Sequence, residues 1–532
     1  MAHPNATSER PASFIVPPAS AFPRAPAGAR LGGTLWIDVE DLFQYAANGK
    51  RPSGIQRLAF EIDRALYEEY GDIGRVRFVR HGSRQGGLEI VSWGAIVALF
   101  DRLTRTELST AATAEQADAP NEALPPLAPQ GQARRVVHWL LRRLPTEIRE
   151  ALHRFLRAEA EAARALAAIP GALWRWGVAR FPRLHAGRRE ARPVDHEPGA
   201  SRPAPAAEAT GGIFRRLVAP GDVLLVLGSP WFRADYGAFV EALKRRHDMR
   251  VAVLVYDLIP HLHPEWCDPY LVRMFRAWFA SVLPLADAIF AISRASADDV
   301  EAYAAEVGFP LSRRVQPIPI GTGFGAAHSA AAVPPWPRLP LPCTYALVVS
   351  TIEPRKNHML LFRVWRRLVA EMPRERVPTL VCAGRVGWMV GDLMQQLANA
   401  EWLDDKIRLV EDPTDAEIEA LYRGCLFTLF PSFAEGWGLP VTESLAFGKP
   451  CLIADHAALR EAGGTLARYF DPDNLHDAYR TIRATIEDPA GLAAWEAQVQ
   501  REFRPVPWGE SAAAILDDLG LSAASTARPL LA

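Results

Sequence analysis

Cysteine, lysine and long apolar runs are scarce in this chain of 532 residues, and each scarcity argues against a class of protein. The five cysteines show no paired short spacing, which argues against a disulfide scaffold and predicts reduced, buried thiols. The formal net charge is only −1, so no global field marks the chain as a nucleic-acid binder. Lysine occurs 5 times against 55 arginines, which we attribute to coding bias.

No apolar run reaches the ~20 residues that a helix needs to cross a bilayer, and no signal peptide is recognisable. We therefore expect a cytoplasmic protein. Peripheral contact with the inner face of the cell membrane stays open.

Buried strand patterns alternate with helical ones over much of the chain, which predicts an α/β protein of two Rossmann-like domains. A proline-rich stretch at 334–342 marks the boundary between them. We place the N-terminal domain at 31–325 and the C-terminal domain at 326–490. Residues 491–532 are predicted to form terminal helices and a tail, and the proline-rich segment 1–30 a disordered tail.

One segment, 97–211, does not follow the alternation of strand and helix and reads as an insertion in the first domain. Its parts 111–130 and 193–207 have the composition of linkers. Between them, 134–192 holds fourteen arginines against five glutamates, with interspersed aromatic residues. Such basic helical patches suit an anionic membrane surface, and they equally suit a helical insertion with a solvated arginine face.

The most informative stretch is 430–453, in which a strand, a glycine-broken loop, a helix and a second strand follow one another. Glu435 lies in the loop and Glu443 in the first turn of the helix. Gly436 and Gly438 allow backbone to approach a ligand closely. The start of such a helix attracts phosphate, while carboxylates accept hydrogen bonds from sugar hydroxyls. The combination predicts a sugar-nucleotide site.

A second loop carries two adjacent cations, Arg355 and Lys356, between the buried strand 345–350 and an amphipathic helix. Fixed cations beside free backbone amides can hold a diphosphate and stabilise the charge that it gains on leaving. The alternative is a pair of solvated surface side chains.

Two loops of the first domain are further candidates. Ser53 and Gln56 have capping-box spacing around Gly54, so this segment could be a helix cap with nothing bound. After a later strand, Asp257 could cap the following turn or act in a site, and His261 lies in the same proline-rich loop.

These segments together resemble the "glycosyl transferases group 1" family of retaining GT-B glycosyltransferases. The resemblance rests mainly on Glu435 and Glu443, separated by seven residues that include Gly436-Trp437-Gly438-Leu439-Pro440. It extends to the 353–357, 53–57 and 257–266 segments. The resemblance implies two Rossmann-like domains facing across a cleft, the GT-B fold, with Glu435 on the donor sugar and Glu443 on the ribose.

The resemblance also assigns further residues of the site. The backbone of Gly436, Trp437, Gly438 and Leu439, with Thr442, would lie against the donor. Arg355 and Lys356 would hold its pyrophosphate, and Val410 would contact its base. Gly54 would border the cleft that takes the acceptor and would lie near the donor. Ser293 would lie near the phosphates, although an N-cap role for Ser296 is as good an interpretation of that segment.

One position departs from the family pattern. Tyr256 stands where many members carry a histidine, so Asp257 and His261 are the candidate catalytic side chains in that loop, with His263 as an alternative.

The implied activity is a retaining, metal-independent hexosyl transfer with no cofactor besides the nucleotide-sugar co-substrate. GDP-mannose is the first choice of donor, because 54–57 and 257–264 are similar to bacterial mannosyltransferases. The acceptor would be a glycan or lipid-linked saccharide in surface polysaccharide synthesis. A sugar-nucleotide 2-epimerase and a non-catalytic membrane adaptor are the alternatives.

Overall fold

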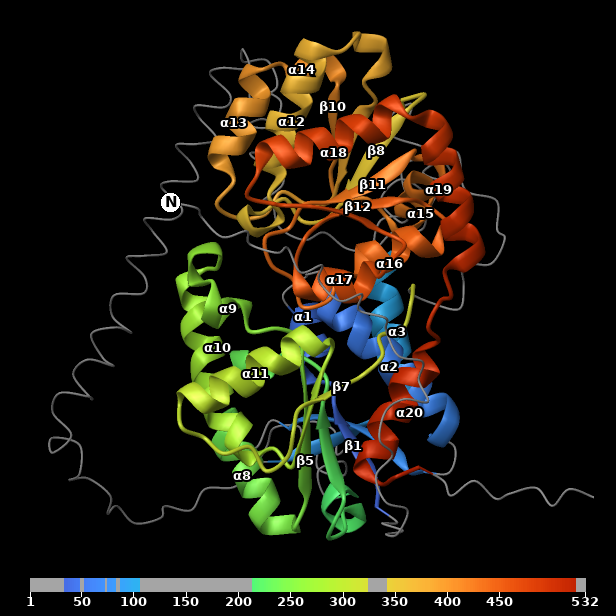
Figure 1. The fold of residues 1–532 in the computed structure, drawn as a ribbon. Coiled ribbons are helices and arrows are strands. Elements are labelled where there is room, and N and C mark those ends of the chain that lie inside the picture. The colour runs from blue at the N-terminus through green and yellow to red at the C-terminus, as the bar shows by residue number, and fades with distance from the viewer. Residues whose placement is uncertain are drawn as a thin grey trace, which may run out of the picture. The chain divides into compact units, whose positions relative to one another are not determined.

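The computed structural model describes residues 33–47, 52–71, 74–82, 87–105, 213–323 and 342–522. The predicted tail at 1–30, both linkers and the basic segment 134–192 lie outside the described residues. Within the described ranges the protein is α/β and contains two sheets, as predicted, each flanked by helices (Figure 1).

The first sheet has seven strands in the order β3-β2-β1-β4-β5-β6-β7, parallel except for the β2–β3 pair. Its strands are β1 (Leu35–Asp38), β2 (Val76–His81), β3 (Leu88–Val91), β4 (Val223–Val226), β5 (Arg250–Val255), β6 (Ala288–Ala291) and β7 (Gln316–Pro317). The accompanying helices are α1 (Glu40–Ala47), α2 (Gly54–Tyr70), α3 (Trp93–Arg105), α8 (Tyr236–His247), α9 (Ile259–Leu262), α10 (Pro269–Val282) and α11 (Arg294–Glu306). Short 3₁₀ turns are η3 (Pro230–Phe232), η4 (Pro264–Trp266) and η5 (Leu283–Leu285).

The second sheet has six parallel strands in the order β10-β9-β8-β11-β12-β13. The strands are β8 (Tyr345–Val349), β9 (Thr379–Ala383), β10 (Ile407–Val410), β11 (Phe427–Phe430), β12 (Cys451–Ala454) and β13 (Arg468–Phe470). The helices are α12 (His358–Glu371), α13 (Gly391–Asn399), α14 (Trp402–Asp405), α15 (Asp415–Gly424), α16 (Leu439–Ala446), α17 (Ala457–Gly463), α18 (Leu475–Glu487), α19 (Pro489–Glu502) and α20 (Trp508–Leu519), with the 3₁₀ turns η6 (Pro354–Lys356) and η7 (Arg374–Arg376).

The strand order of the second sheet decides where its site can form. Counting its own strands from one, the order is 3-2-1-4-5-6, the doubly wound order of a Rossmann fold. The order reverses between β8 and β11, and ligands of such folds bind beyond the carboxyl ends of the strands at this switch point. The loops after β8 and β11 carry the cation pair and Glu435, respectively.

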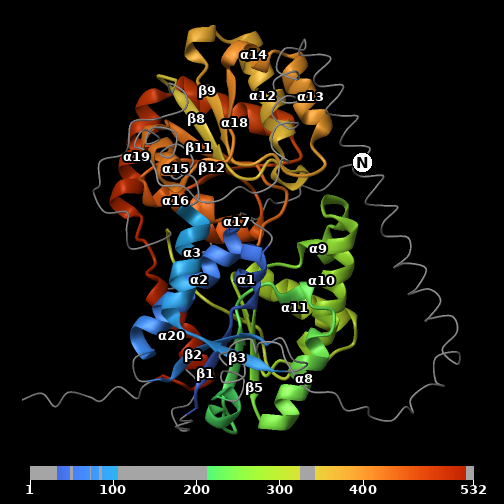
Figure 2. The same ribbon diagram turned by 180° about the vertical axis from the view of Figure 1, so that it is seen from behind.

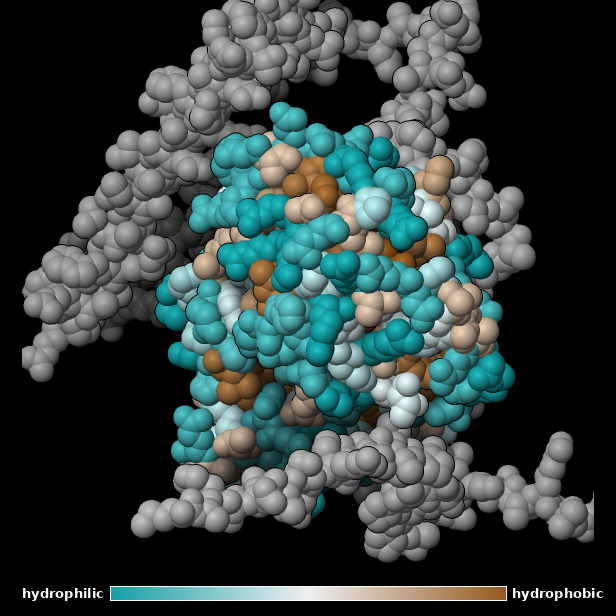
Figure 3. Space-filling model, turned by 45° about the horizontal axis from the view of Figure 1, so that its top comes forward, coloured by the Kyte–Doolittle hydropathy of each residue, from teal (hydrophilic) through white to brown (hydrophobic). Residues whose placement is uncertain are grey.

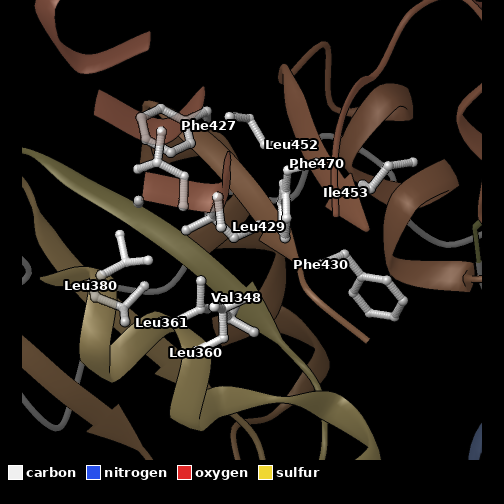
Figure 4. Close-up of a cluster of buried hydrophobic side chains, with 14 of the residues drawn as sticks. Val348, Leu360, Leu361, Leu380, Phe427, Leu429, Phe430, Leu452, Ile453 and Phe470 are labelled. Atoms are coloured by element: carbon white, nitrogen blue, oxygen red, sulfur yellow. The ribbon is translucent and has the colours of Figure 1, made fainter. Parts of the chain in front are cut away.

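Alternate strand residues pack into separate cores on the two faces of each sheet, as buried parallel strands require. In the first sheet, Leu35 and Ile37 join a cluster with α2, α3 and α20, whereas Trp36 joins α8, α10 and α11 on the other face. Figure 4 shows part of the second domain's core, in which side chains of β8, β9, β11, β12, β13 and α12 converge.

The last helix returns to the first sheet's domain. α20 packs along α2, and the two helices lie side by side in Figures 1 and 2. Its Trp508 donates the indole N–H to the Gly323 carbonyl at 2.7 Å, and the ring fills the space that a Cβ at Gly321 would need. Ser511 Oγ donates to the Pro319 carbonyl at 2.6 Å. These contacts fix the C-terminal crossover of the described chain.

One helix was not foreseen and one expectation needs correction. The segment after β1 forms α1, whose Leu42 is buried and whose Glu40 N–H donates to Asp38 Oδ1 at 3.0 Å. The thiols are free as expected, and four of the five are buried, but Cys343 is exposed.

None of the described helices combines the length and apolar character that a membrane crossing needs. The face shown in Figure 3 is largely hydrophilic, with small hydrophobic patches between hydrophilic residues.

Candidate functional site

Two glycines shape the loop between β11 and α16. A Cβ at Gly436 would lie 2.2 Å from the backbone oxygen of Tyr256, so only glycine allows this close approach between the two domains. Gly438 has a φ of +110° and caps α16, a conformation that a side chain would strain. The loop therefore holds Glu435 in a fixed place beside the first domain.

Glu435 is the centre of an ion-pair cluster. Its Oε1 lies 2.5 Å from Lys356 Nζ and its Oε2 lies 2.7 Å from Arg355 Nη1, and the carboxylate is 9% exposed. Burial alone would raise the pKa of this carboxyl, but the two adjacent cations outweigh burial and lower the pKa to about 2. Glu435 is therefore a firmly ionised group and a weak base.

Glu353 is a member of this cluster that sequence reasoning missed. Its side chain is 4% exposed, and its Oε1 accepts from Arg355 Nη2 at 2.6 Å. Arg355 Nη1 also donates to the Ala434 carbonyl at 2.9 Å. Burial opposes ionisation of Arg355, yet the two carboxylates Glu435 and Glu353 raise its pKa. The position of Glu353 in the same short segment as the cations was the available signal.

Lys356 faces different surroundings. Its ammonium lies 5.0 Å from the centre of the Phe430 ring, in addition to the Glu435 carboxylate. Burial and the neighbouring Arg355 charge lower the pKa of Lys356, and Glu435 opposes that shift. The Glu435 carboxylate thus favours the charged form of the ammonium.

Asp257 both caps a turn and lies near the ion-pair cluster, the two alternatives that the sequence left open. Its Oδ1 accepts from the Ile259 N–H at 3.0 Å, which caps the turn into α9. Burial raises the pKa of the carboxyl, while the charge of Arg355 lowers it, so Asp257 also belongs to the electrostatic surroundings of the cluster. A partly buried acid with a raised pKa is a candidate for proton transfer.

The histidines of this loop are placed less directly. The His261 ring packs edge-on against Tyr303 of α11, with centroids 5.0 Å apart. Among the described residues no hydrogen bond or ion pair joins the His261 side chain to the Glu435 cluster. His263 stacks on Trp266, with centroids 4.4 Å apart. The structure therefore brings Asp257 to the cluster and points the His261 ring toward α11.

Tyr256, which departs from the histidine of the family pattern, contacts two backbone carbonyls through its hydroxyl. Its hydroxyl donates to the Leu227 carbonyl at 2.6 Å and lies 3.3 Å from the Ile55 carbonyl. It therefore ties the end of β4 to the first turn of α2. The capping box of α2, with Ser53 and Gln56, is present as predicted.

Glu443 lies apart from the cation pair. Its Oε2 accepts from the Tyr422 hydroxyl at 3.0 Å. Burial raises the pKa of Glu443, whereas Tyr422 and the Arg57 charge lower it. Arg57 comes from α2 of the first domain and pairs with Asp415 of the second at 2.7 Å. Arg57 is thus a second residue near the site that sequence reasoning did not select.

The start of α11 differs from one expectation. Ser293, not Ser296, is the N-cap, because Ser293 Oγ accepts from the Ser296 N–H at 2.9 Å. The Glu461 carboxylate of α17 accepts from the two preceding backbone N–H groups, those of Arg294 and Ala295, at 2.8 Å each. A protein carboxylate therefore already occupies this helix start. Contact between Ser293 and donor phosphates stays a prediction.

The remaining candidates lie along the same edge. Val410 accepts from the Gly384 N–H at 3.0 Å, and Thr442 Oγ1 donates to the Leu439 carbonyl at 3.0 Å. A Cβ at Gly54 would lie 3.7 Å from Leu439, which places the start of α2 beside α16. Their donor contacts stay predictions.

Trp437 packs against buried residues of both domains, and its buried indole N–H has no hydrogen-bond partner within the described part of the chain. A buried donor without a partner carries an energetic cost, which a ligand acceptor would relieve.

Comparison with known sequences places this geometry in context. Residues 339–501 match the profile of a family described as "Glycosyl transferases group 1". Over 283 residues the chain is 27% identical to the serotype-specific mannosyltransferase WbdA of Escherichia coli, a match that covers 51% of this chain and 33% of that protein. Over 164 residues it is 31% identical to the O-antigen chain mannosyltransferase B of Escherichia coli, covering 31% and 42%. Over 182 residues it is 25% identical to the D-inositol 3-phosphate glycosyltransferase of Rhodococcus opacus (strain B4), covering 33% and 40%. The matches thus span less than half of each of these relatives.

Among solved structures, the chain can be aligned with TarM at a TM-score of 0.42 and 13% identity over 58% of this chain and 57% of that one. Another is trehalose-6-phosphate from E. coli bound with UDP-2-fluoro glucose, with a TM-score of 0.43 and 12% identity over 58% and 75%.

Proposed function

We propose that the chain transfers a sugar from a nucleotide-diphosphate sugar to a saccharide acceptor, because residues 339–501 match the profile of the glycosyl transferases group 1 family. The observation that carries this proposal is the cluster at the switch point of the second sheet. There Glu435 lies within ion-pair distance of both Arg355 and Lys356.

The cluster supplies the two kinds of group that such a donor needs. A guanidinium and an ammonium bind phosphate oxygens, and a carboxylate accepts hydrogen bonds from sugar hydroxyls. We expect the donor to exchange partners within the cluster, so that its diphosphate takes the cations and a sugar hydroxyl takes Glu435. Cations fixed beside the diphosphate stabilise the negative charge that it gains as it leaves.

We further propose that the anomeric configuration is retained. The bond from the sugar carbon to the diphosphate oxygen breaks while the acceptor oxygen bonds to the same face of that carbon. The acceptor proton passes to an oxygen of the leaving diphosphate. Glu435 is a poor base because its pKa is held at about 2, which supports a role in positioning the sugar. Asp257, whose pKa is raised, is the better candidate for steering this proton toward the leaving diphosphate oxygen.

Metal independence is part of the proposal. Arg355 and Lys356 would supply the positive charge that a divalent cation supplies in other transferases. The expected result is that donor turnover persists in excess EDTA.

GDP-mannose is the proposed donor, because two of the relatives are named as mannosyltransferases. The proposed acceptor is a growing glycan or lipid-linked saccharide in surface polysaccharide synthesis, in line with the O-antigen chain in one relative's name. Membrane contact through 134–192 lies outside the described residues and stays a prediction. Liposome flotation with and without residues 111–207 would test it, and equal flotation would remove the idea.

The test is turnover of GDP-mannose and UDP-sugars by the purified chain, measured as release of the nucleoside diphosphate. Lys356→Ala should lower turnover by about 100-fold or more, as loss of a group that stabilises a developing charge typically does. Lys449→Ala is the matched control. Lys449 is 14% exposed against 13% for Lys356. Its Nζ lies 2.7 Å from Glu496 Oε1, in an ion pair that is separate from the cluster.

The outcomes separate the candidate functions. Full turnover by Lys356→Ala would refute the assignment of the phosphate site. Release of an altered free sugar without any acceptor would indicate an epimerase. Absence of both donor turnover and nucleotide binding would favour a non-catalytic adaptor.

A further inference from the structure

A stack of aromatic rings lies beside the candidate site, and we call His263, Trp266, Phe433 and Trp388 the aromatic shelf. Trp266 is near parallel to His263 at 4.4 Å and to Phe433 at 5.5 Å between ring centroids. Trp388 Nε1 donates to the Trp266 carbonyl at 2.8 Å. The shelf is therefore one connected unit, built from the α9–α10 connection of the first domain and two loops of the second.

Backbone hydrogen bonds join this shelf to the ion-pair cluster. The Phe433 N–H donates to the Arg355 carbonyl at 2.9 Å, and Phe433 lies two residues before Glu435. The Gly387 N–H, next to Trp388, donates to the Ile352 carbonyl at 2.9 Å, in the segment that leads to Glu353. The shelf and the cluster therefore share the same supporting loops, so a molecule on the shelf lies close to the proposed donor.

The shelf leaves aromatic surface open to solvent. Trp388 is 44% exposed although its single polar atom already bonds within the protein. What remains for a ligand is thus ring carbon surface, held at a fixed orientation by that bond. Neighbouring Met389 is 66% exposed and Leu262 on α9 is 45% exposed. Exposed apolar patches of this kind commonly mark binding surfaces.

We propose that the aromatic shelf binds a pyranose ring of the saccharide acceptor, with Trp388 as the main contact. The proposal rests on the proposed glycosyl transfer and extends it to the acceptor. A pyranose has an apolar C–H face and a rim of hydroxyl groups. The apolar face packs on an aromatic ring, and the hydroxyl rim needs polar partners. His263 and Glu265 can supply them, since their side chains are exposed and are hydrogen-bonded to each other at 3.2 Å.

Exposed aromatic side chains could also bind a membrane surface, but the charges beside the shelf argue against a membrane. Glu265 and Asp268 flank Trp266 and are both exposed. An anionic lipid surface would repel these carboxylates, whereas hydroxyl groups of a sugar would hydrogen-bond to them.

The test measures binding of a panel of manno-, gluco-, galacto- and N-acetylgluco-oligosaccharides to the full chain by titration calorimetry, with GDP present. At least one oligosaccharide should bind, and Trp388→Ala should weaken its Kd by about fivefold to tenfold, the usual scale of one aromatic contact. Trp388→Phe keeps a ring and should stay within about threefold of wild type. Tyr270→Ala is the control for an exposed aromatic side chain outside the shelf, since Tyr270 is 56% exposed on α10.

The shelf assignment is overturned if no oligosaccharide of the panel binds, or if Trp388→Ala binds as tightly as wild type. Liposome binding that depends on Trp388, without saccharide binding, would also overturn it in favour of a membrane contact. Release of nucleoside diphosphate by wild type, measured with and without the saccharides of the panel, reports separately on the proposed function. Its absence under both conditions would refute the glycosyl transfer itself.

Discussion

Glu461 of α17 caps α11 across the two domains, with its carboxylate oxygens 2.8 Å from the amide nitrogens of Arg294 and Ala295. A carboxylate at a helix start is stabilised by the unpaired N–H groups and by the helix dipole. Ser296 Oγ donates to the Tyr256 carbonyl at 2.9 Å and lies 3.3 Å from the Gly436 carbonyl of the second domain. The first domain is therefore fastened to the second at the edge of the candidate site.

We predict that Glu461→Gln weakens this fastening, because an amide has one acceptor oxygen and no charge to offer the helix. The expected loss in the free energy of unfolding is about 1–2 kcal/mol. Urea denaturation followed by circular dichroism measures it. Arg460→Ala, on the same helix but in an exposed pair with Asp455, should change stability by less than about 0.5 kcal/mol. Equal effects of the two substitutions would contradict a specific cap.

The sequence predicted what is local. The strands, the capping box of α2 and the glycine loop could be predicted because residue spacing and turn chemistry determine them within a few positions. The proximity of Lys356 and Glu435 follows from topology, since the loops after two adjacent strands meet at the switch point. Their ion pair at 2.5 Å agrees with a shared site, while their roles toward a donor stay predictions.

The contacts that could not be predicted join segments far apart in the chain. The cap of α11 by Glu461 links residues 166 and 167 positions apart, and the Arg57–Asp415 pair links residues 358 positions apart. No periodicity encodes such partners, because they depend on how two separately folded sheets approach each other. The contact of the Tyr256 hydroxyl with the Leu227 carbonyl joins residues 29 positions apart within the first domain and depends on the packing there.

Gly436→Ala should disable the site with little loss of the fold. The added Cβ would need the place 2.2 Å from the Tyr256 backbone oxygen, so the β11–α16 loop must shift. A displacement of about 1 Å in a positioned group can cost about 100-fold in turnover, which is the effect we expect on nucleoside diphosphate release. Gly391→Ala is the matched control, because a Cβ there has no neighbour within 4 Å. Wild-type turnover by Gly436→Ala would show that the close approach is unnecessary.

Tyr422→Phe should weaken nucleotide binding through Glu443. The hydroxyl that donates to Glu443 Oε2 is removed, while the ring keeps its stacking on Phe447 with centroids 5.1 Å apart. Without that donor Glu443 loses the hydrogen bond that orients its carboxylate for a ribose hydroxyl, and its already raised pKa should rise further. We expect about a tenfold higher Kd for GDP, measured by calorimetry at pH 7. An unchanged Kd would place the ribose elsewhere.

The pH dependence of stability should carry the signature of Glu435. Its pKa in the folded protein is lowered to about 2, below the value near 4.3 of a free glutamate, so the folded state favours the ionised form. The stabilisation is therefore complete above about pH 4.3 and is lost as the pH falls from there toward 2. A shift of this size corresponds to about 3 kcal/mol as an upper bound.

Glu435→Gln isolates this contribution, because the other acidic groups titrate in both proteins. We expect wild type to lose up to about 3 kcal/mol more than Glu435→Gln between pH 5 and pH 2.5, measured by urea denaturation at each pH. At pH 7 the variant should be less stable, since Arg355 and Lys356 then remain buried beside each other without their shared carboxylate. Parallel pH profiles for the two proteins would mean that the cation contacts do not persist in solution, and the cluster could then not serve as the donor site in the form described.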